Sequence, residues 1–170
     1  MRARTVRCSA RFMRCDIRRR GSAAMRSKLV SDGPRKTYVL ILDKDDEAVS
    51  SITGFARAHG LGAAQLTGIG AFSDAVLGFF DWEAKDYRKI PVCEQVEVAS
   101  LIGDVALGPD ERPSLHLHVV VSRSDGSAMG GHLLEAHVRP TLEVVLTESP
   151  EHLRKRKDSA SGLALITLGS

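Results

Sequence analysis

The sequence predicts an α+β fold in a single domain, with one large and mainly antiparallel sheet and an early helix packed on it. Two observations lead to this prediction. A segment with helical periodicity follows a first apolar strand, and from residue 63 onward the chain is a series of strand-like segments separated by turn residues. At 170 residues the chain is long enough to bury the core of one domain.

The first strand and the helix are predicted close together in the sequence. Residues 37–42 form a short apolar run that is typical of a strand. The acidic residues 43–46 would supply the N-cap and the negative charge that favour a first helical turn. Apolar residues recur at helical spacing from 48 to 58, and Gly60 is suited to end the helix. We interpret the neighbouring His59 as a cation at the helix terminus.

Strand patterns account for the rest of the domain. The expected strands are 63–69, 75–80, 87–91, 95–107, 115–122, 131–138 and 141–147. The segment 95–107 is long for one strand, so Gly103 is expected to mark a bulge or a bend. Residues 150–160, with the basic run Arg154–Lys157, are expected to be exposed to solvent, and 162–168 could return as a last short strand.

The net charge of +3 is divided unevenly along the chain. Residues 1–24 hold eight arginines and one acid, which leaves 16 basic and 20 acidic residues in 25–170. We therefore divide the chain into a disordered basic extension (1–24), a domain (25–150) and a polar C-terminal segment (151–170). Three interpretations of the extension are open: a misassigned start with Met25 as the true first residue, a solvated arm that contacts nucleic acid or anionic surfaces, and an organelle-targeting segment.

Cysteine usage and hydropathy indicate a soluble, cytoplasmic protein that does not enter a membrane. No apolar run approaches the roughly 18 residues needed to span a bilayer. Cys93 is the one cysteine of residues 25–170, which indicates a reducing compartment and no disulfide framework. We interpret Cys93 as a small packing residue. The chain contains no Cys-x-x-Cys pair, so a thiolate zinc ribbon is excluded.

Three histidines have the spacing of a metal site. His116 and His118 alternate with aliphatic residues, so a strand would place both imidazoles on one face. Asp125-Gly126 is a turn signal midway between His118 and His132, so a hairpin would set these two residues opposite each other, with Cβ atoms about 5 Å apart. Three imidazoles suit a divalent metal, zinc above all, and would leave a coordination position open.

The alternative for these residues is an ordinary polar sheet face, or a subunit interface that the histidines only line. His137 stands an odd number of residues from His132, so a regular strand would send it to the other face. His152 lies in the polar C-terminal segment, and neither histidine is assigned to the site. Four glycines are expected to let the backbone approach a pocket or a neighbouring subunit closely: Gly68, Gly70, Gly130 and Gly131.

The sequence does not identify a reaction. Four acidic residues could act as a general base or support a metal ligand, and nothing in the sequence chooses among them: Glu94, Glu97, Glu135 and Glu143. No Gly-x-Ser-x-Gly motif is present, and Cys93 has no recognisable histidine partner. Nucleophilic hydrolase chemistry is therefore unsupported, and whether the protein is an enzyme stays open.

Five segments, in this order and at these separations, carry a family resemblance. They are Thr67-Gly-Ile-Gly-Ala-Phe-Ser-Asp-Ala-Val-Leu-Gly-Phe-Phe-Asp81, Leu115-His-Leu-His-Val119, Asp125-Gly126, Gly130-Gly-His-Leu133 and Thr141-Leu-Glu-Val-Val145. Over about residues 28–150 the chain resembles the plants and prokaryotes conserved (PPC) domain family. The resemblance implies a compact α+β domain assembled as a homotrimer. The architecture of this family is also similar to that of acetolactate decarboxylase, whose zinc is held by a His-x-His strand and a later histidine.

The family label "predicted DNA-binding protein", which comes largely from plant members with AT-hooks, gives a second hypothesis. Phosphate contacts require clustered Lys and Arg, whereas residues 25–170 are net acidic. The AT-hook core Arg-Gly-Arg-Pro is absent, and no platform of aromatic and basic residues is expected. We therefore favour a three-histidine metal site that acts on or senses a small molecule, with a DNA-binding or regulatory role as the alternative.

Overall fold

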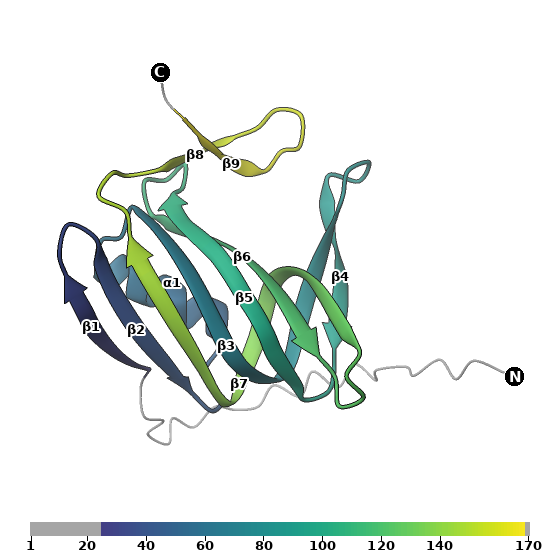
Figure 1. The fold of residues 1–170 in the computed structure, drawn as a ribbon. Helices are drawn as coiled ribbons and strands as arrows, with labels where there is room; N and C mark the ends of the chain where they lie inside the picture. Colours follow the sequence, from purple (N-terminus) through teal and green to yellow (C-terminus); the bar gives the residue numbers. More distant parts are fainter. Residues whose placement is uncertain (1–24, 169–170) are drawn as a thin grey trace, which may run out of the picture.

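The computed structural model describes residues 25–168 as one curled sheet with a single helix (Figure 1). The elements are β1 (Arg26–Asp32), β2 (Lys36–Asp43), α1 (Ala48–Ala58), β3 (Ala63–Asp81), β4 (Asp86–Val92), β5 (Val96–Leu107), β6 (Pro113–Ser122), β7 (Ala128–Glu148), β8 (Arg154–Lys157) and β9 (Ala164–Thr167). The α+β class, the largely antiparallel sheet and the early helix are confirmed. The predicted basic extension, residues 1–24, lies outside the described residues.

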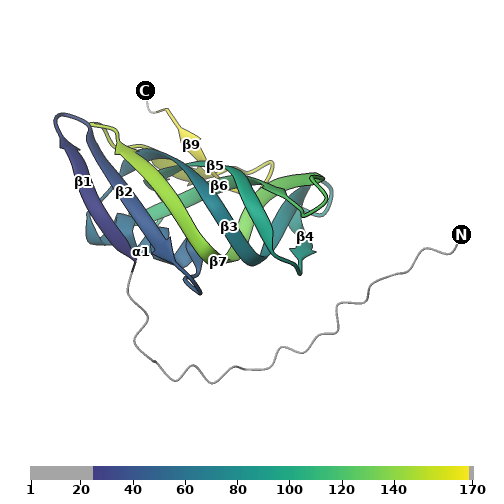
Figure 2. The same ribbon diagram turned by 60° about the horizontal axis from the view of Figure 1, so that its bottom comes forward.

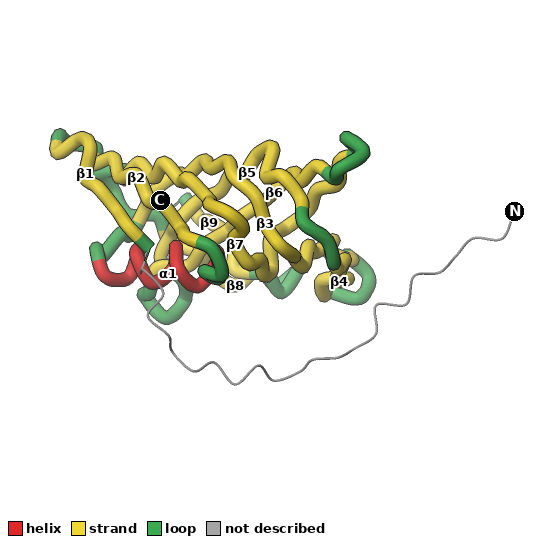
Figure 3. The backbone as a smooth tube through the Cα atoms, turned by 90° about the horizontal axis from the view of Figure 1, so that it is seen from below, coloured by secondary structure: helices red, strands yellow, loops and turns green. Residues whose placement is uncertain are grey.

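Two long strands allow the sheet to close on itself. The first half of β3 pairs with β5, β5 pairs with β6, and β6 pairs with the first half of β7. That half of β7 returns to the second half of β3, where His132 pairs with Gly78. The pairing therefore runs in a ring, and register shifts in β3 and β7 supply the bends that it needs. Figures 2 and 3 show the curl of the strands. The helix α1 lies against β6 and β7, and its Phe55 contacts Tyr38 of β2, with 5.1 Å between ring centroids.

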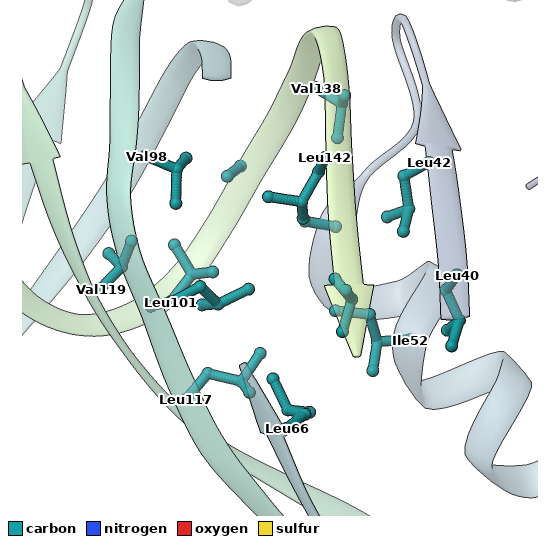
Figure 4. Packing of buried hydrophobic residues seen from close by; sticks show 14 of the residues in the cluster. Leu40, Leu42, Ile52, Leu66, Val98, Leu101, Leu117, Val119, Val138 and Leu142 are labelled. Atoms are coloured by element: carbon teal, nitrogen blue, oxygen red, sulfur yellow. The ribbon is translucent and has the colours of Figure 1, made fainter. Parts of the chain in front are cut away.

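The core fills the inside of this curled sheet. Alternation along β6 buries Leu117, Val119 and Val121 and leaves His116, His118 and Val120 exposed. Figure 4 shows side chains of the two halves of the sheet converging on the same space, together with Ile52 of α1. The outward face of β6 is thus the face that carries the histidines.

The helix begins one residue later than the acidic segment 43–46 predicted. Its N-cap is Glu47, whose carboxylate accepts hydrogen bonds from the amides of Val49 (3.0 Å) and Ser50 (2.6 Å). The same carboxylate accepts a hydrogen bond from the Ala136 amide of β7 at 3.2 Å. The glutamate side chain is thus long enough to accept hydrogen bonds from the helix and from the sheet together. His59 stands at the C-cap, as predicted.

Several strand predictions need correction. Residues 63–69 and 75–80 belong to one strand, β3, and 131–138 and 141–147 belong to one strand, β7. Gly103 marks no bulge: it pairs in regular register with Leu66 and Leu117, and a Cβ there would collide with the His116 carbonyl. β1 was not predicted, because all of its residues are exposed and its sequence has no apolar alternation.

The predictions for Cys93 and for the basic run Arg154–Lys157 also need correction. Cys93 is exposed and is not a packing residue of the core. The basic run Arg154–Lys157 was expected to be a solvated segment, but it forms β8, which pairs with β9 and with the end of β5. Lys155, in the middle of this strand, is only 4% exposed. Its neighbours Arg154 and Arg156 point to solvent, so the alternation of a strand buries one cation out of the run.

Candidate metal centre

The β6–β7 hairpin brings His118 and His132 together. The register places His118 directly opposite His132, and Ser122 opposite Ala128 next to the turn. The turn is held by the Asp125 carboxylate, which accepts hydrogen bonds from the Ser127 amide (2.8 Å) and hydroxyl (2.6 Å). The hairpin predicted from the Asp125-Gly126 signal therefore forms with the expected partners.

The three imidazoles form a compact cluster. The ring centroids of His116, His118 and His132 are 5.1, 5.3 and 5.4 Å apart. One ligand nitrogen of each ring lies within 4.8 Å of the others, and the Nε2 atoms of His116 and His118 are 3.2 Å apart. Nitrogen atoms that share a metal at about 2.0–2.1 Å lie roughly 3–4 Å from one another, so a small adjustment of the rings would suffice.

The electrostatics of the cluster favour the neutral form of His118 and His132. Burial, followed by the charges of His116, His118 and Lys155, lowers the pKa of His132 from 6.5 to about 4. Burial and the neighbouring His116 also lower the pKa of His118. A neutral imidazole keeps a nitrogen lone pair for a metal.

One nitrogen of the cluster has no partner in the described part of the chain. Nδ1 of His132 is buried and makes no hydrogen bond. A buried polar atom without a partner costs free energy. A cation bound by all three rings would offset the cost of burying the His132 imidazole. The residues present therefore fit a metal bound by three imidazoles.

Three further residues surround the cluster, and sequence reasoning missed all of them. Asp104 of β5 lies opposite His116, with Oδ2 3.5 Å from Nδ1 of that ring. The other oxygen, Oδ1, forms an ion pair with Lys155 Nζ at 3.1 Å, and the same Nζ donates a hydrogen bond to the Ser114 carbonyl at 3.1 Å. Tyr87 of β4 stacks on His132, with 4.7 Å between ring centroids.

A carboxylate behind a metal-binding histidine fixes the tautomer and the orientation of its ring. Asp104 is placed to do this for His116, since a proton on Nδ1 leaves Nε2 for a metal. The strand pairing that sets Asp104 beside His116 joins residues of different strands, so no local sequence signal marked it. Lys155 and Tyr87 come from still more distant elements.

The predicted glycines lie around the outward sheet face. Gly130 and Gly131 line a hollow together with His118, and Gly68 lines a neighbouring one with Ile69 and Ile102. Backbone approaches these glycines closely: a Cβ on Gly131 would lie 2.9 Å from the Gly78 carbonyl oxygen. Gly70 has a φ of +153°, and a Cβ there would collide with the Thr141 carbonyl.

His137 was predicted on the face opposite to His132, and this is wrong. The register of β7 shifts between Leu133 and Glu135, which adds one residue and reverses the parity of the strand. His137 therefore alternates with buried Ala136 and Val138 and points away from the core, as His132 does. Its Nδ1 lies 2.9 Å from an Asp74 oxygen, so it belongs to a separate pair.

The four glutamates considered as general bases lie outside the three-histidine cluster. Glu94 pairs with Arg123 at 3.0 Å. Glu143 borders the hollow around Ile69, and Glu135 borders a groove beside α1. The acidic residue nearest the cluster is Asp104, which the sequence did not single out.

The fold and the cluster define a class: a single α+β domain with a candidate metal centre on the outward face of its sheet. The Plants and Prokaryotes Conserved (PCC) domain family matches residues 30–150, and the chain belongs to this family. Within the described residues, no helix has the length and the apolar character needed to cross a membrane.

Solved structures share this fold over most of their length. A putative DNA-binding protein from Bacteroides thetaiotaomicron has a TM-score of 0.77 at 29% identity, over 85% of this chain and 97% of that one. A plant- and prokaryote-conserved (PPC) protein from Pyrococcus horikoshii scores 0.74 at 29% identity, over 88% and 98%. A metal-containing protein from Archaeoglobus fulgidus scores 0.72 at 32% identity, over 86% and 100%.

Two other similarities are more limited. The chain is 33% identical over 148 residues to the bifunctional protein GlmU of Synechococcus sp., but it spans only 22% of that protein's length. A Staphylococcus aureus protein described as similar to alpha-acetolactate decarboxylase has a TM-score of 0.49 at 11% identity. That likeness is too weak to carry an argument about the chemistry of the histidines.

Proposed function

We propose that this protein is a metalloprotein whose His116, His118 and His132 hold one divalent metal, zinc by preference, and that the open coordination position takes a small molecule. The observation that carries the proposal is the meeting of three imidazole side chains whose ligand nitrogens lie within 4.8 Å of one another. A metal bound there would supply a Lewis acid with an exchangeable position. Whether the site catalyses a reaction or senses a ligand is left open.

Two features of the surroundings support a metal over a polar surface patch. Asp104 supports His116 from behind, as carboxylates do behind metal-binding histidines. Nδ1 of His132 is buried but neither accepts nor donates a hydrogen bond among the described residues, whereas buried polar atoms of structural residues nearly always have a partner. The Archaeoglobus fulgidus relative, 32% identical, is described as metal-containing.

Metal analysis of the purified protein tests the proposal. Protein prepared without chelators and then dialysed should retain about one metal per chain, measured by inductively coupled plasma mass spectrometry. A His118→Ala variant should lose this metal, because two imidazoles bind zinc far more weakly than three. The matched control is His137→Ala, which removes another outward-facing histidine that lies outside the cluster. Metal-free wild-type protein, or equal metal in both variants, would refute the proposal.

DNA binding is the second candidate, and one observation favours it beyond the names of the relatives. The β3–β4 hairpin places aromatic and basic residues next to each other. Lys85 Nζ lies 3.7 Å from the centre of the exposed Trp82 ring, and the Arg88 guanidinium lies 5.0 Å from that of Phe79. Aromatic and cationic side chains together can stack on bases.

The charge of residues 25–170 opposes this second candidate, with 16 basic against 20 acidic residues. An electrophoretic mobility assay at low salt decides the matter if it includes the full chain, the chain from Met25 and a Trp82→Ala variant of each. DNA binding through the hairpin requires a shift that Trp82→Ala reduces in both. A shift that only the full chain shows would assign it to residues 1–24.

We also propose that the chain assembles as a homotrimer, as the family resemblance implies, and that it is cytoplasmic, as its cysteine usage indicates. Exposed apolar side chains lie on the outward faces of β3, β5, β6 and β7, among them Ile69, Ile102, Val120 and Val145. Exposed apolar clusters of this kind mark interaction surfaces. Sedimentation velocity should give three times the chain mass of 18.4 kDa for the wild type and a smaller species for Ile102→Glu.

A further inference from the structure

A second pocket opens beside the histidines, under the C-terminal β8–β9 hairpin. It measures about 370 Å³, and its walls include His116, His132 and Tyr87 on one side and Lys155, Leu165 and Ile166 on the other. The hairpin lies across the end of the sheet where β5 stops and β6 starts (Figure 1). The family match ends at residue 150, so β8 and β9 lie beyond it.

Lys155 gives this pocket a buried positive charge. Its side chain is 4% exposed and has one ion pair, with Asp104, and one hydrogen bond, to the Ser114 carbonyl. An ammonium group has three donors, so at least one N–H remains for a ligand. A lysine is rarely buried to this extent unless its charge is matched, and Asp104 is shared between Lys155 and His116.

The charges around the pocket favour an anion. No carboxylate is among the residues described as lining it, and Asp104, which lies behind them, offsets one positive charge. With a divalent metal on the histidines, Lys155 would leave the local charge at about +2. A ligand carboxylate placed between the metal and Lys155 would meet both cations in a setting shielded from water.

The opposite wall selects the rest of the ligand. β9 contributes Ile166, which pairs with Lys155 and therefore lies on the same face of the β8–β9 hairpin as that lysine. In the single chain Ile166 is 37% exposed. A short aliphatic group lying against Ile166 would bury that surface.

We propose that this pocket binds a small carboxylate with a short aliphatic chain, its carboxylate on Lys155 and its aliphatic part against Ile166. The inference rests on the proposed metal centre for the second contact of the ligand. The contact of the ligand carboxylate with Lys155 is the new element, since the three histidines by themselves predict only the metal.

Binding of butyrate to the zinc-loaded full chain tests the proposal, measured by ligand-detected nuclear magnetic resonance. Butyramide, which has the same size and no charge, should bind at least tenfold more weakly. Acetate has two methylenes fewer than butyrate, and a fully buried methylene strengthens binding about fourfold. Because burial here is partial, acetate should bind roughly fivefold to tenfold more weakly than butyrate. Equal binding of butyrate and butyramide would overturn the proposal.

The decisive variant is Lys155→Met, which keeps the length of the side chain and removes the charge. It should weaken butyrate binding about tenfold or more and leave butyramide unchanged. Lys157→Met is the matched control, since Lys157 is exposed two residues along the same strand. Butyrate affinity that is the same in the Lys155→Met and Lys157→Met variants would overturn the proposal. Should Lys155→Met fail to fold, Ile166→Ala serves instead and must reduce the preference for butyrate over acetate.

Zinc content, measured on every sample, separates this proposal from the metal centre. If the wild type carries zinc and its butyrate affinity is independent of Lys155, the anion pocket is refuted and the metal centre stands. If the wild type carries no metal but binds butyrate in a Lys155-dependent way, the metal centre is refuted and the anion pocket stands.

Discussion

His118 and His132 form a directly opposed pair across β6 and β7, with 5.4 Å between their ring centroids. Their ring planes are nearly perpendicular, at 84°. A slip of one residue in this hairpin would turn one of the two rings into the core. The buried residues that alternate with them, Leu117 and Leu133, fix the register and thereby fix the site.

Asp104→Asn should weaken zinc binding by about 10- to 100-fold, the usual effect of losing a carboxylate behind a metal-binding histidine. The change removes the charge that faces Nδ1 of His116 and keeps the size of the side chain. Competition with a chromophoric chelator measures the affinity. Glu97→Gln, an exposed change on the same strand, is the control. A difference of less than twofold between the two variants would contradict this role.

Two glycine-to-alanine changes should have opposite effects on stability. Gly131→Ala should lower the free energy of unfolding by about 1–3 kcal/mol, because the new Cβ would lie 2.9 Å from a backbone oxygen. Gly54→Ala, inside α1 with open space around it, should raise that free energy by about 0.5–1 kcal/mol. Urea unfolding curves compare them, and destabilisation by both would show that the contacts at Gly131 are not the cause.

Removing the helix cap should also destabilise the fold. Glu47→Ala leaves the amides of Val49, Ser50 and Ala136 without their side-chain acceptor, so a loss of about 1–2 kcal/mol is expected. Lys44→Ala, at an exposed position just before the helix, should change the unfolding free energy by less than about 0.5 kcal/mol. Equal unfolding midpoints for the two variants would show that the cap is dispensable.

The His137–Asp74 pair should stabilise the fold at acidic pH. The hydrogen bond to Asp74 raises the pKa of His137 above 6.5, with smaller contributions from Glu135 and Glu47 and against the effect of burial. A raised folded-state pKa means that the stabilisation is complete below pH 6.5 and is lost as the pH rises through the higher value. Because the pair is partly exposed, the effect should be only about 0.5 kcal/mol.

The difference in unfolding free energy between the wild type and His137→Gln measures this contribution. It should be larger at pH 5.5 than at pH 8.5, and the pH dependence should vanish in an Asp74→Asn background. A difference that grows with pH would contradict the sign of the linkage.

Local pattern was enough to predict that His116, His118 and His132 lie together. The alternation around His116 and His118, with a turn signal midway to His132, specifies a hairpin face without any knowledge of the remaining fold. The same reasoning failed for His137, because the register shift in β7 has no marker in the sequence and reverses the parity of every later residue.

The residues around the ligands could not be predicted, because they arrive by long-range pairing. Asp104 of β5 lies opposite His116 of β6. Lys155, which contacts both Asp104 and the Ser114 carbonyl, comes 41 residues after Ser114 in the chain. A basic run in a polar segment ordinarily indicates a solvated surface. Only the pairing of β8 with β9 and the end of β5 buries one lysine of that run against the site.

The identity of the atoms that bind the metal is the most direct test of the proposed three-histidine centre. X-ray absorption at the zinc edge of the zinc-loaded protein reports the ligands directly. We predict a first shell of three imidazole nitrogens and one light atom at about 2.0–2.1 Å, with one imidazole fewer in His132→Ala. A shell of oxygens without imidazole, or sulfur at about 2.3 Å, would contradict a centre built from His116, His118 and His132.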